Sequence, residues 1–319
     1  MRKFLILSVM IALFSVLTPL LAKKKPGEAV PVQTAYASPP AETADASQET
    51  VAVFSHETGR TEDMSMTDYI IGVVAAEMPA EYEKEALKAQ ALAAITYTRY
   101  VTADGGSIST DSAVNQSYKT NAELQTLWGD AYEENYKKIR DAVAAVENLS
   151  IIYEGKPILA AYFAISGGRT ENASDIWGGN YPYLRSTASD GDTLSPAAET
   201  RATFSANELY EKLNAVHETA ACDEPEHYIG NTERTAAGAV VKISIGGTDY
   251  SGTEVRTALG LASPDFEVNY DGEQFVFTAH GYGHLVGMSQ YGADYMARQG
   301  ADFREILLHY YTGAEIVAV

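Results

Sequence analysis

The chain has 319 residues, of which 46% are hydrophobic and 21% charged, and its formal net charge at pH 7 is −20. A protein this acidic lacks the basic surface that holds nucleic acid, which excludes nucleic acid as a partner. The single cysteine, Cys222, excludes an internal disulfide. Its acidic neighbours Asp223, Glu224 and Glu226 would raise a thiol pKa, which argues against a cysteine nucleophile.

The first 25 residues predict a membrane anchor. An apolar run at residues 4–22 is followed by three lysines, and about 20 apolar residues can span a bilayer. A cleaved secretory signal is the alternative, but the run is long for one and ends without a small-x-small cleavage site. We therefore expect a single-pass helix with the body of the protein outside the cytoplasm. Residues 26–50 hold four prolines and little large apolar content, which predicts a disordered tether.

A solitary carboxylate, Glu77, follows an apolar segment for which Thr67 is the predicted N-cap. Pro79 disfavours helical geometry at Met78, so this helix should end at Glu77 or Met78. Unpaired carbonyls at a helix C-terminus and apolar neighbours both raise a carboxyl pKa. A carboxyl group that is partly protonated near neutral pH can act as a general acid, although most such glutamates are solvated surface residues.

Downstream elements alternate between helices and hairpins. A second helix is predicted at residues 83–100, and its Gln90 is either satisfied within the core or a ligand contact. Residues 108–118 are typical of a loop. A helix should follow, beginning near residue 121 or 131 and ending at 147.

The segments 150–153 and 158–165 predict a β-hairpin. Paired glycines at 167–168 would let a ligand approach the backbone N–H groups, and Trp177 could stack on a sugar or fill the core.

The C-terminal part predicts a further helix–hairpin region. Residues 217–237 are typical of a surface insertion, and its His217, Cys222 and His227 lack the paired spacing and fourth ligand of a zinc site. The other elements expected here are a helix with a capping box at Ser205 and Glu208, a strand at 240–245, a helix at 253–259 stopped by Gly260, a hairpin at 266–278 turning at Asp271-Gly272, and helices ending near 299 and 311.

Four blocks of sequence resemble the stage II sporulation protein D family and occur in the family's order. The blocks are VVAAEMP at residues 73–79, EALKAQA at 85–91, SGGRTENA at 166–173 and GHLVGMSQYGA at 283–293. The resemblance implies an α+β catalytic domain over residues 51–319, with mixed helices and antiparallel hairpins around a glycan-binding cleft. It also implies a lytic transglycosylase that acts on peptidoglycan strands lacking stem peptides during spore engulfment.

The resemblance makes Glu77 the catalytic acid and base. A solitary carboxyl group suffices for a reaction in which the muramyl 6-hydroxyl attacks C1 and closes a 1,6-anhydro ring. An anionic glycan approaching an acidic protein needs local cations, and candidates include Lys88, Lys119, Lys156 and Arg169. The residues assigned to substrate binding are Lys88, Gln90, Gln116, Tyr118, Ser166, Gly167, Gly168, Arg169, His284, Ser289, Gln290 and Tyr291.

The implied partners are peptidoglycan strands, a stage II sporulation protein P-like amidase and a protein M-like membrane partner, with no cofactor and no metal. Two departures from the family pattern limit which residue roles of the family can be assigned to this chain. Ile95 occupies the place of a common family arginine, and residues 101–116 contain none of the Cys and His that some relatives use for zinc. A wall-binding activator of an amidase is the rival function, because some relatives are described as amidase enhancers. A cysteine or metallo hydrolase lacks a credible set of residues.

Overall fold

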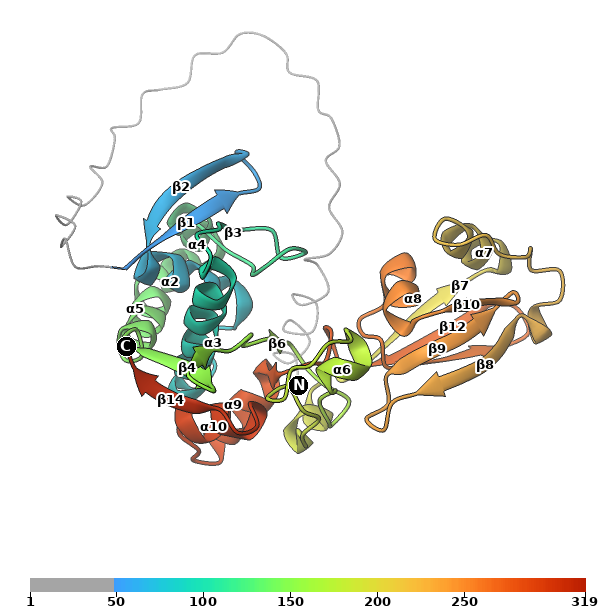
Figure 1. Cartoon of the computed structure of the whole chain (residues 1–319). Coiled ribbons are helices and arrows are strands. Elements are labelled where there is room, and N and C mark those ends of the chain that lie inside the picture. The colour runs from blue at the N-terminus through green and yellow to red at the C-terminus, as the bar shows by residue number, and fades with distance from the viewer. Residues whose placement is uncertain (1–48) are drawn as a thin grey trace, which may run out of the picture. The chain divides into compact units, whose positions relative to one another are not determined.

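A computed structural model describes residues 49–319. The predicted anchor at residues 1–25 and almost all of the predicted tether lie outside the described residues. Within residues 49–319, no helix is long and apolar enough to cross a membrane. Helices and mainly antiparallel small sheets alternate along this part of the chain (Figure 1), so the α+β prediction is confirmed.

The helices of the described chain are α2 (Met66–Glu77), α3 (Lys84–Thr102), α4 (Asn121–Trp128), α5 (Tyr132–Ala144), α6 (Ala173–Ile176), α7 (Ala206–Asn214), α8 (Gly252–Leu259), α9 (Gln290–Arg298) and α10 (Phe303–Tyr310), with 3-10 turns η1 (Gly129–Ala131), η2 (Asp190–Leu194) and η3 (Pro225–His227). The strands are β1 (Thr50–Ser55), β2 (Arg60–Ser65), β3 (Ile108–Ser109), β4 (Leu149–Tyr153), β5 (Lys156–Pro157), β6 (Tyr162–Phe163), β7 (Glu199–Phe204), β8 (Ile229–Arg234), β9 (Val240–Ile245), β10 (Thr248–Tyr250), β11 (Phe266–Tyr270), β12 (Phe275–His280), β13 (Met288–Ser289) and β14 (Glu315–Ala318).

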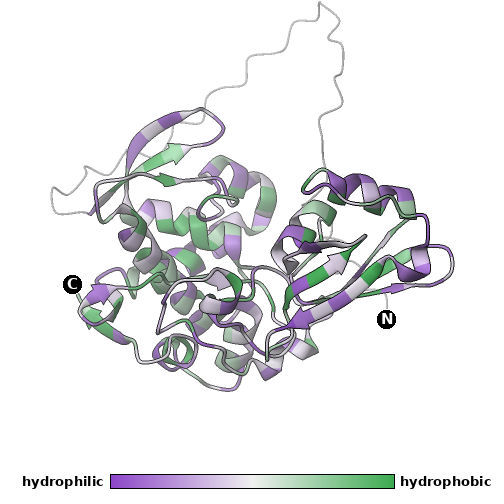
Figure 2. Ribbon diagram, turned by 45° about the vertical axis from the view of Figure 1, so that its right-hand side comes forward, coloured by the Kyte–Doolittle hydropathy of each residue, from purple (hydrophilic) through white to green (hydrophobic). Residues whose placement is uncertain are grey.

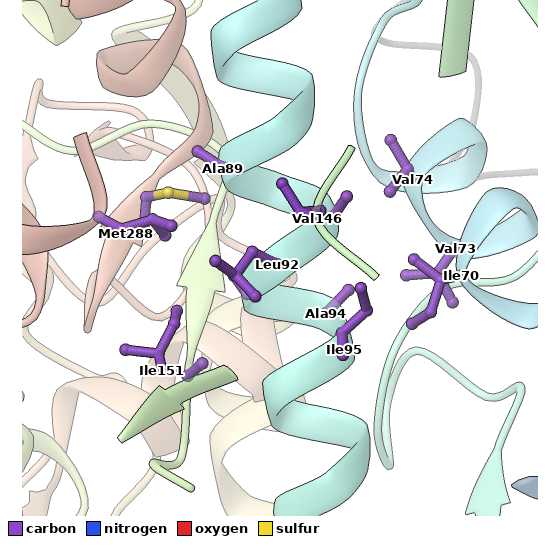
Figure 3. Close-up of a cluster of buried hydrophobic side chains, with 14 of the residues drawn as sticks. Ile70, Val73, Val74, Ala89, Leu92, Ala94, Ile95, Val146, Ile151 and Met288 are labelled. Atoms are coloured by element: carbon purple, nitrogen blue, oxygen red, sulfur yellow. The ribbon is translucent and has the colours of Figure 1, made fainter. Parts of the chain in front are cut away.

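The first hydrophobic cluster is built around α3, which packs against α2, α5, α9, α10 and β4. Alanines on α3 let these neighbours approach closely, and Leu92 and Ile95 fill the space between them. Figure 3 shows Ile70 and Val73 of α2 on one side of α3 and Met288 on the other. The helix that ends at Glu77 is therefore held in the core, because its residues 69–75 are all buried and so each face of this part is packed.

The second hydrophobic cluster lies between two three-stranded antiparallel sheets and the helices α7 and α8. The sheets have the orders β11-β12-β7 and β10-β9-β8. Buried and partly exposed residues alternate along β12, as a strand with one face in a core requires, and Figure 2 shows hydrophobic and hydrophilic residues alternating along such strands. Glu171 ties the two clusters together, because its carboxyl accepts hydrogen bonds from Thr235 at 2.7 Å and from the Ala239 N–H at 2.9 Å.

Many of the predicted elements are confirmed. The first helix ends at Glu77, and Met78 is extended. The second occupies residues 84–102, close to the predicted span. The confirmed elements toward the C-terminus are the capping box of α7, strand β9, helix α8 with left-handed Gly260 after it, the β11–β12 hairpin, and helices α9 and α10.

Three predictions about local structure are wrong, and a fourth is confirmed only in part. Ser65, not Thr67, caps α2, since its hydroxyl accepts the Asp68 N–H. Of the two starts predicted for the helix up to residue 147, residue 131 is confirmed by α5, whereas a helix from 121 is interrupted, because Gly129 takes a positive φ after α4; α5 also ends at Ala144, not at 147. Residues 158–165 do not form the return strand of a hairpin: β5 is two residues long, and β6 pairs with β13 in parallel. The segment 217–237 is not only an insertion, because it contributes the edge strand β8.

Candidate active site

Glu77 is held at the C-terminus of α2 by two donors from distant parts of the chain. The Ser117 N–H donates to Oε1 at 2.7 Å, and the Gln290 side-chain amide donates to Oε2 at 3.3 Å. Gln290 is the first residue of α9, and its amide also donates to Gln90 Oε1 of α3 at 3.4 Å. Gln290 therefore links the sequence block of Glu77 with that of Gln90.

The pKa of Glu77 is raised above its ordinary value because burial disfavours the charged form, and the hydrogen bonds from Ser117 and Gln290 oppose that shift. The direction agrees with the prediction from the apolar neighbours of Glu77. A carboxyl group with a raised pKa can carry a proton nearer neutral pH, and the two donors still stabilise the carboxylate once the proton has left.

A buried polar network around Gln116 supports the segment that carries the Ser117 N–H. The Gln116 amide donates to Tyr69 Oη at 3.3 Å and to Thr98 Oγ1 at 3.1 Å, and Gln116 Oε1 accepts the Tyr162 hydroxyl at 2.8 Å. Tyr118 stacks on Tyr69 with ring centroids 5.6 Å apart. Gln116 is buried in this network, whereas Tyr118 is partly exposed. Both assignments to substrate binding remain predictions.

Ser289 precedes Gln290 and links α9 to a second buried carboxylate, Asp192. The Ser289 hydroxyl accepts the Gly292 N–H as N-cap of α9 and donates to Asp192 Oδ1 at 2.8 Å. Ser166 donates to Asp192 Oδ2 through both its N–H, at 2.8 Å, and its hydroxyl, at 2.5 Å. Ser166, Ser289 and Asp192 are fully buried. Asp192 therefore fixes the start of α9, and through it the position of the Gln290 amide.

The Ser166-Gly-Gly-Arg turn presents different groups than its sequence suggests. The Gly168 N–H donates to Ser166 Oγ and so is not open to a ligand. Gly167 packs closely against Asp265, so that an added Cβ would lie 2.9 Å from Asp265 Oδ2. Arg169 is exposed and its side chain makes only long hydrogen bonds, of 3.3 and 3.4 Å, to Ser186, so it can still meet a ligand.

His284 is half-buried between aromatic rings, with its ring centroid 4.9 Å from that of Trp177 and 5.7 Å from that of Phe163. Its Nδ1 accepts the Val286 N–H at 3.1 Å. Burial, with a smaller contribution from the charge of Arg256, lowers its pKa to about 4, so the ring is neutral at physiological pH. A hydrogen bond with the backbone of Tyr162 partly opposes this shift. Trp177 is 40% exposed and is therefore not a core plug.

Lys88 and Tyr291 also lie apart from the contacts of Glu77. Lys88 pairs with Glu85 at 2.6 Å, and it lines a surface pocket of about 360 Å³ together with Lys84, Glu134, Lys137, Lys138, Asp141 and Ala142. Tyr291 meets the edge of Tyr82, with ring centroids 6.5 Å apart. The shape of a glycan-binding cleft stays a prediction.

Two groups that organise the site were missed from the sequence. The Ser117 N–H lies between two residues that were named, and a backbone donor leaves no mark in a sequence pattern. Asp192 belongs to a polar Ser-Asp-Gly-Asp run that is typical of a surface loop, and nothing local indicates that it is buried. Pairing partners more than 20 residues away in sequence decide the role of both groups.

Comparison with known proteins places the chain in a family. A family profile described as "Stage II sporulation protein" matches residues 55–153. The stage II sporulation protein D of Bacillus subtilis (strain 168) is 38% identical over 335 residues, covering 99% of this chain and 96% of the relative. That of Bacillus amyloliquefaciens is 41% identical over 274 residues, covering 83% of this chain and 78% of the relative. The "Amidase enhancer" of Bacillus subtilis (strain 168) is 28% identical over 299 residues, covering 77% of this chain and 40% of the relative. The chain therefore belongs to the stage II sporulation protein D family.

Proposed function

We propose that this sporulation protein is a lytic transglycosylase that cleaves the bond between N-acetylmuramic acid and N-acetylglucosamine in glycan strands lacking stem peptides. The observation that supports the proposal is the setting of Glu77, whose pKa is raised by burial and whose two oxygens each have one donor. Among the described residues that bond to Glu77 or shift its pKa, none is a second carboxylate. Glycosidases that use water pair two carboxylates, whereas an internal sugar nucleophile needs one.

The reaction follows from one proton carrier. Protonated Glu77 gives its proton to the glycosidic oxygen as the bond from that oxygen to the muramyl C1 breaks. The muramyl 6-hydroxyl oxygen then bonds to C1, and its proton passes to Glu77, which regenerates the acid. Between the two transfers Glu77 is a carboxylate, the form that the Ser117 N–H and the Gln290 amide stabilise. No water is consumed, and the product carries a 1,6-anhydro ring.

The proposed setting is the cell wall during engulfment. The apolar run at residues 4–22 would anchor the chain in the membrane, with residues 51–319 facing the wall. A stage II sporulation protein P-like amidase would supply strands without stem peptides, and a protein M-like membrane protein would hold both enzymes in place. Family membership supports this setting.

Mass spectrometry of denuded glycan after incubation with the purified protein tests the activity. We expect fragments with 1,6-anhydromuramyl ends, lighter by one water than hydrolytic fragments. Glu77→Gln should bind glycan and abolish cleavage, because the amide is nearly isosteric but cannot carry the proton; general acid–base groups contribute about 10²–10⁴-fold. Reducing muramyl ends, or turnover by Glu77→Gln close to that of the wild type, would contradict the proposal.

Activation of an amidase is a second candidate function, favoured by the relative named "Amidase enhancer". The two functions differ in their need for Glu77. An activator should stimulate release of stem peptides by an added amidase equally well as wild type and as Glu77→Gln, and it should leave denuded strands intact.

A further inference from the structure

The helix that carries Glu77 has an interior glycine, Gly72, at a position with no room for a side chain. A Cβ at residue 72 would lie 2.6 Å from the Lys119 carbonyl oxygen and closer still to the Tyr118 ring. We propose that Gly72 is a positioning residue for Glu77: its lack of a side chain lets residues 117–119 lie against α2, and this contact places the Ser117 N–H on the Glu77 carboxyl group.

The spacing along the two segments supports this assignment. The Lys119 N–H donates to the Gly72 carbonyl at 3.2 Å, and the Ser117 N–H donates to Glu77 at 2.7 Å. Five residues of helix rise about 7.5 Å, and two residues of extended chain reach about 6.8 Å. A segment held against α2 at Gly72 therefore just reaches Glu77. The distance of Lys119 from Gly72 then determines whether the Ser117 N–H can donate to Glu77.

The segment has little freedom to adjust in other ways. Gln116 donates to Tyr69 Oη, and the Tyr118 ring stacks on Tyr69, both one turn before Gly72. A Cβ needs about 3.4 Å from its neighbours for ordinary contact, so the Lys119 carbonyl would have to retreat by about 0.8 Å. The same retreat at Ser117 would stretch its hydrogen bond to Glu77 to the limit of a useful interaction.

The consequence concerns the proton affinity of Glu77. The Ser117 N–H stabilises the carboxylate, so its withdrawal raises the pKa of Glu77 further. The other titratable groups that face Glu77 are the phenols of Tyr69 on α2 and Tyr162 on β6. Burial raises the pKa of both phenols, so they stay neutral throughout the titration of Glu77. The effect on cleavage rests on the proposed function, whereas the effect on the carboxyl group does not.

The test is Gly72→Ala in the full chain, labelled with carbon-13 at the glutamate carboxyl positions for NMR. The Glu77 resonance is identified by its loss in Glu77→Gln. We expect the pKa of Glu77 to move upward, the basic limb of the pH profile of kcat/KM on denuded glycan to move to higher pH, and kcat/KM to fall by about 100-fold. Helix propensity alone favours alanine over glycine, so a loss has to come from the contact.

Two glycine variants separate positioning from stability. In Gly252→Ala the new Cβ meets the Val240 backbone in the second cluster, so this variant should lose stability without moving the pKa of Glu77. In Gly106→Ala the nearest atom is 3.8 Å away, and neither quantity should change. An unchanged Glu77 titration in Gly72→Ala, or an equal shift in Gly252→Ala, would overturn the proposal.

A second variant covers the case in which Gly72→Ala does not fold. Gly72→Ala combined with Tyr118→Ala removes the ring but keeps the Lys119 carbonyl contact. This double variant should still show a raised Glu77 pKa relative to Tyr118→Ala alone, and equal titrations would refute the proposal. A wild-type chain that does not cleave glycan, together with a shifted titration in Gly72→Ala, would reject the proposed function and leave this inference standing.

Discussion

Two carboxyl groups, Asp192 and Glu77, lie on either side of the Ser289–Gln290 peptide, and they differ in burial and in hydrogen bonding. Asp192 is completely buried, and three donors from Ser166 and Ser289 lie within 2.8 Å of its oxygens. Glu77 is partly buried and has one short and one long hydrogen bond. Burial raises the pKa of both groups. The number and quality of donors therefore separate a group that holds loops together from one that is free to exchange a proton.

This comparison gives a physical reason to place the chemistry at Glu77. The carboxylate of Asp192 cannot change its charge without weakening three short hydrogen bonds from buried groups. Glu77 also joins three segments, but a change in its charge affects only one short hydrogen bond, from the Ser117 N–H, and one long hydrogen bond, from the Gln290 amide. The two sites nevertheless depend on each other, since Asp192 orients the residue that precedes Gln290.

The largest expected effect is that of Asp192→Ala on stability. It leaves the Ser166 N–H and the hydroxyls of Ser166 and Ser289 buried without an acceptor, and unsatisfied buried groups cost about 1–3 kcal/mol each before relaxation. We expect the free energy of unfolding to fall by about 3 kcal/mol in urea denaturation.

The matched control for Asp192→Ala is Asp141→Ala. Asp141 is an exposed carboxylate on α5 that pairs with Lys137 at 2.5 Å. Solvent screens such an exposed pair, so this variant should unfold nearly as the wild type does. Equal losses in the two variants would mean that the network around Asp192 adds nothing beyond an ordinary surface carboxylate.

The sequence predicted more of the fold than of the site's support. Glu77 at a helix end follows from Pro79, and the capping box and glycine stop of the later helices follow from local chemistry. Local patterns cannot show that Ser166 and Ser289 meet at Asp192, because the hydrogen bonds join residues 26 and 97 positions apart. The parallel pairing of β6 with β13 was missed for the same reason: it joins segments more than 100 residues apart.

Glu77→Gln should change stability less than Asp192→Ala does, and above neutral pH it should raise the free energy of unfolding where Asp192→Ala lowers it. The folded pKa of Glu77 is raised, so ionisation costs more in the folded than in the unfolded state. Wild-type stability relative to Glu77→Gln should therefore be highest below about pH 4, near the pKa of an unfolded glutamate, and fall as the pH rises through the folded pKa. At pH 8 the variant should be more stable by roughly 1 kcal/mol in thermal or urea unfolding.

Glu123→Gln provides the opposite pH dependence as a control. The Thr120 backbone N–H holds the pKa of Glu123 below its ordinary value in the capping box of α4. Its stabilising effect is present above the unfolded pKa and is lost as the pH falls through the folded one. If Glu77→Gln lost stability at pH 8 as Glu123→Gln does, the Glu77 carboxylate would be as well satisfied as a capping group, and the contrast with Asp192 would fail.

The smallest effect on stability is expected at Arg169, which tests whether the Asp192 region has a ligand of its own. Asp192 anchors the turn through Ser166, and Arg169 extends from it with only long hydrogen bonds to Ser186. Arg169→Ala should therefore change the free energy of unfolding by less than about 0.5 kcal/mol.

The effect of Arg169→Ala on glycan binding should be larger. A strand without stem peptides exposes the lactyl carboxylate of each muramic acid, and a guanidinium can hold a carboxylate in a bidentate manner. The chain carries a formal charge of −20, so no long-range attraction replaces that contact. Arg169→Ala should weaken binding of denuded strands much more than binding of strands whose lactyl groups are reduced or amidated, as measured by co-sedimentation. Arg201→Ala, at an exposed arginine of β7 paired with Glu199, should affect both substrates equally little. Equal losses on the two substrates for Arg169→Ala, or no loss, would leave the turn a purely structural extension of the Asp192 network.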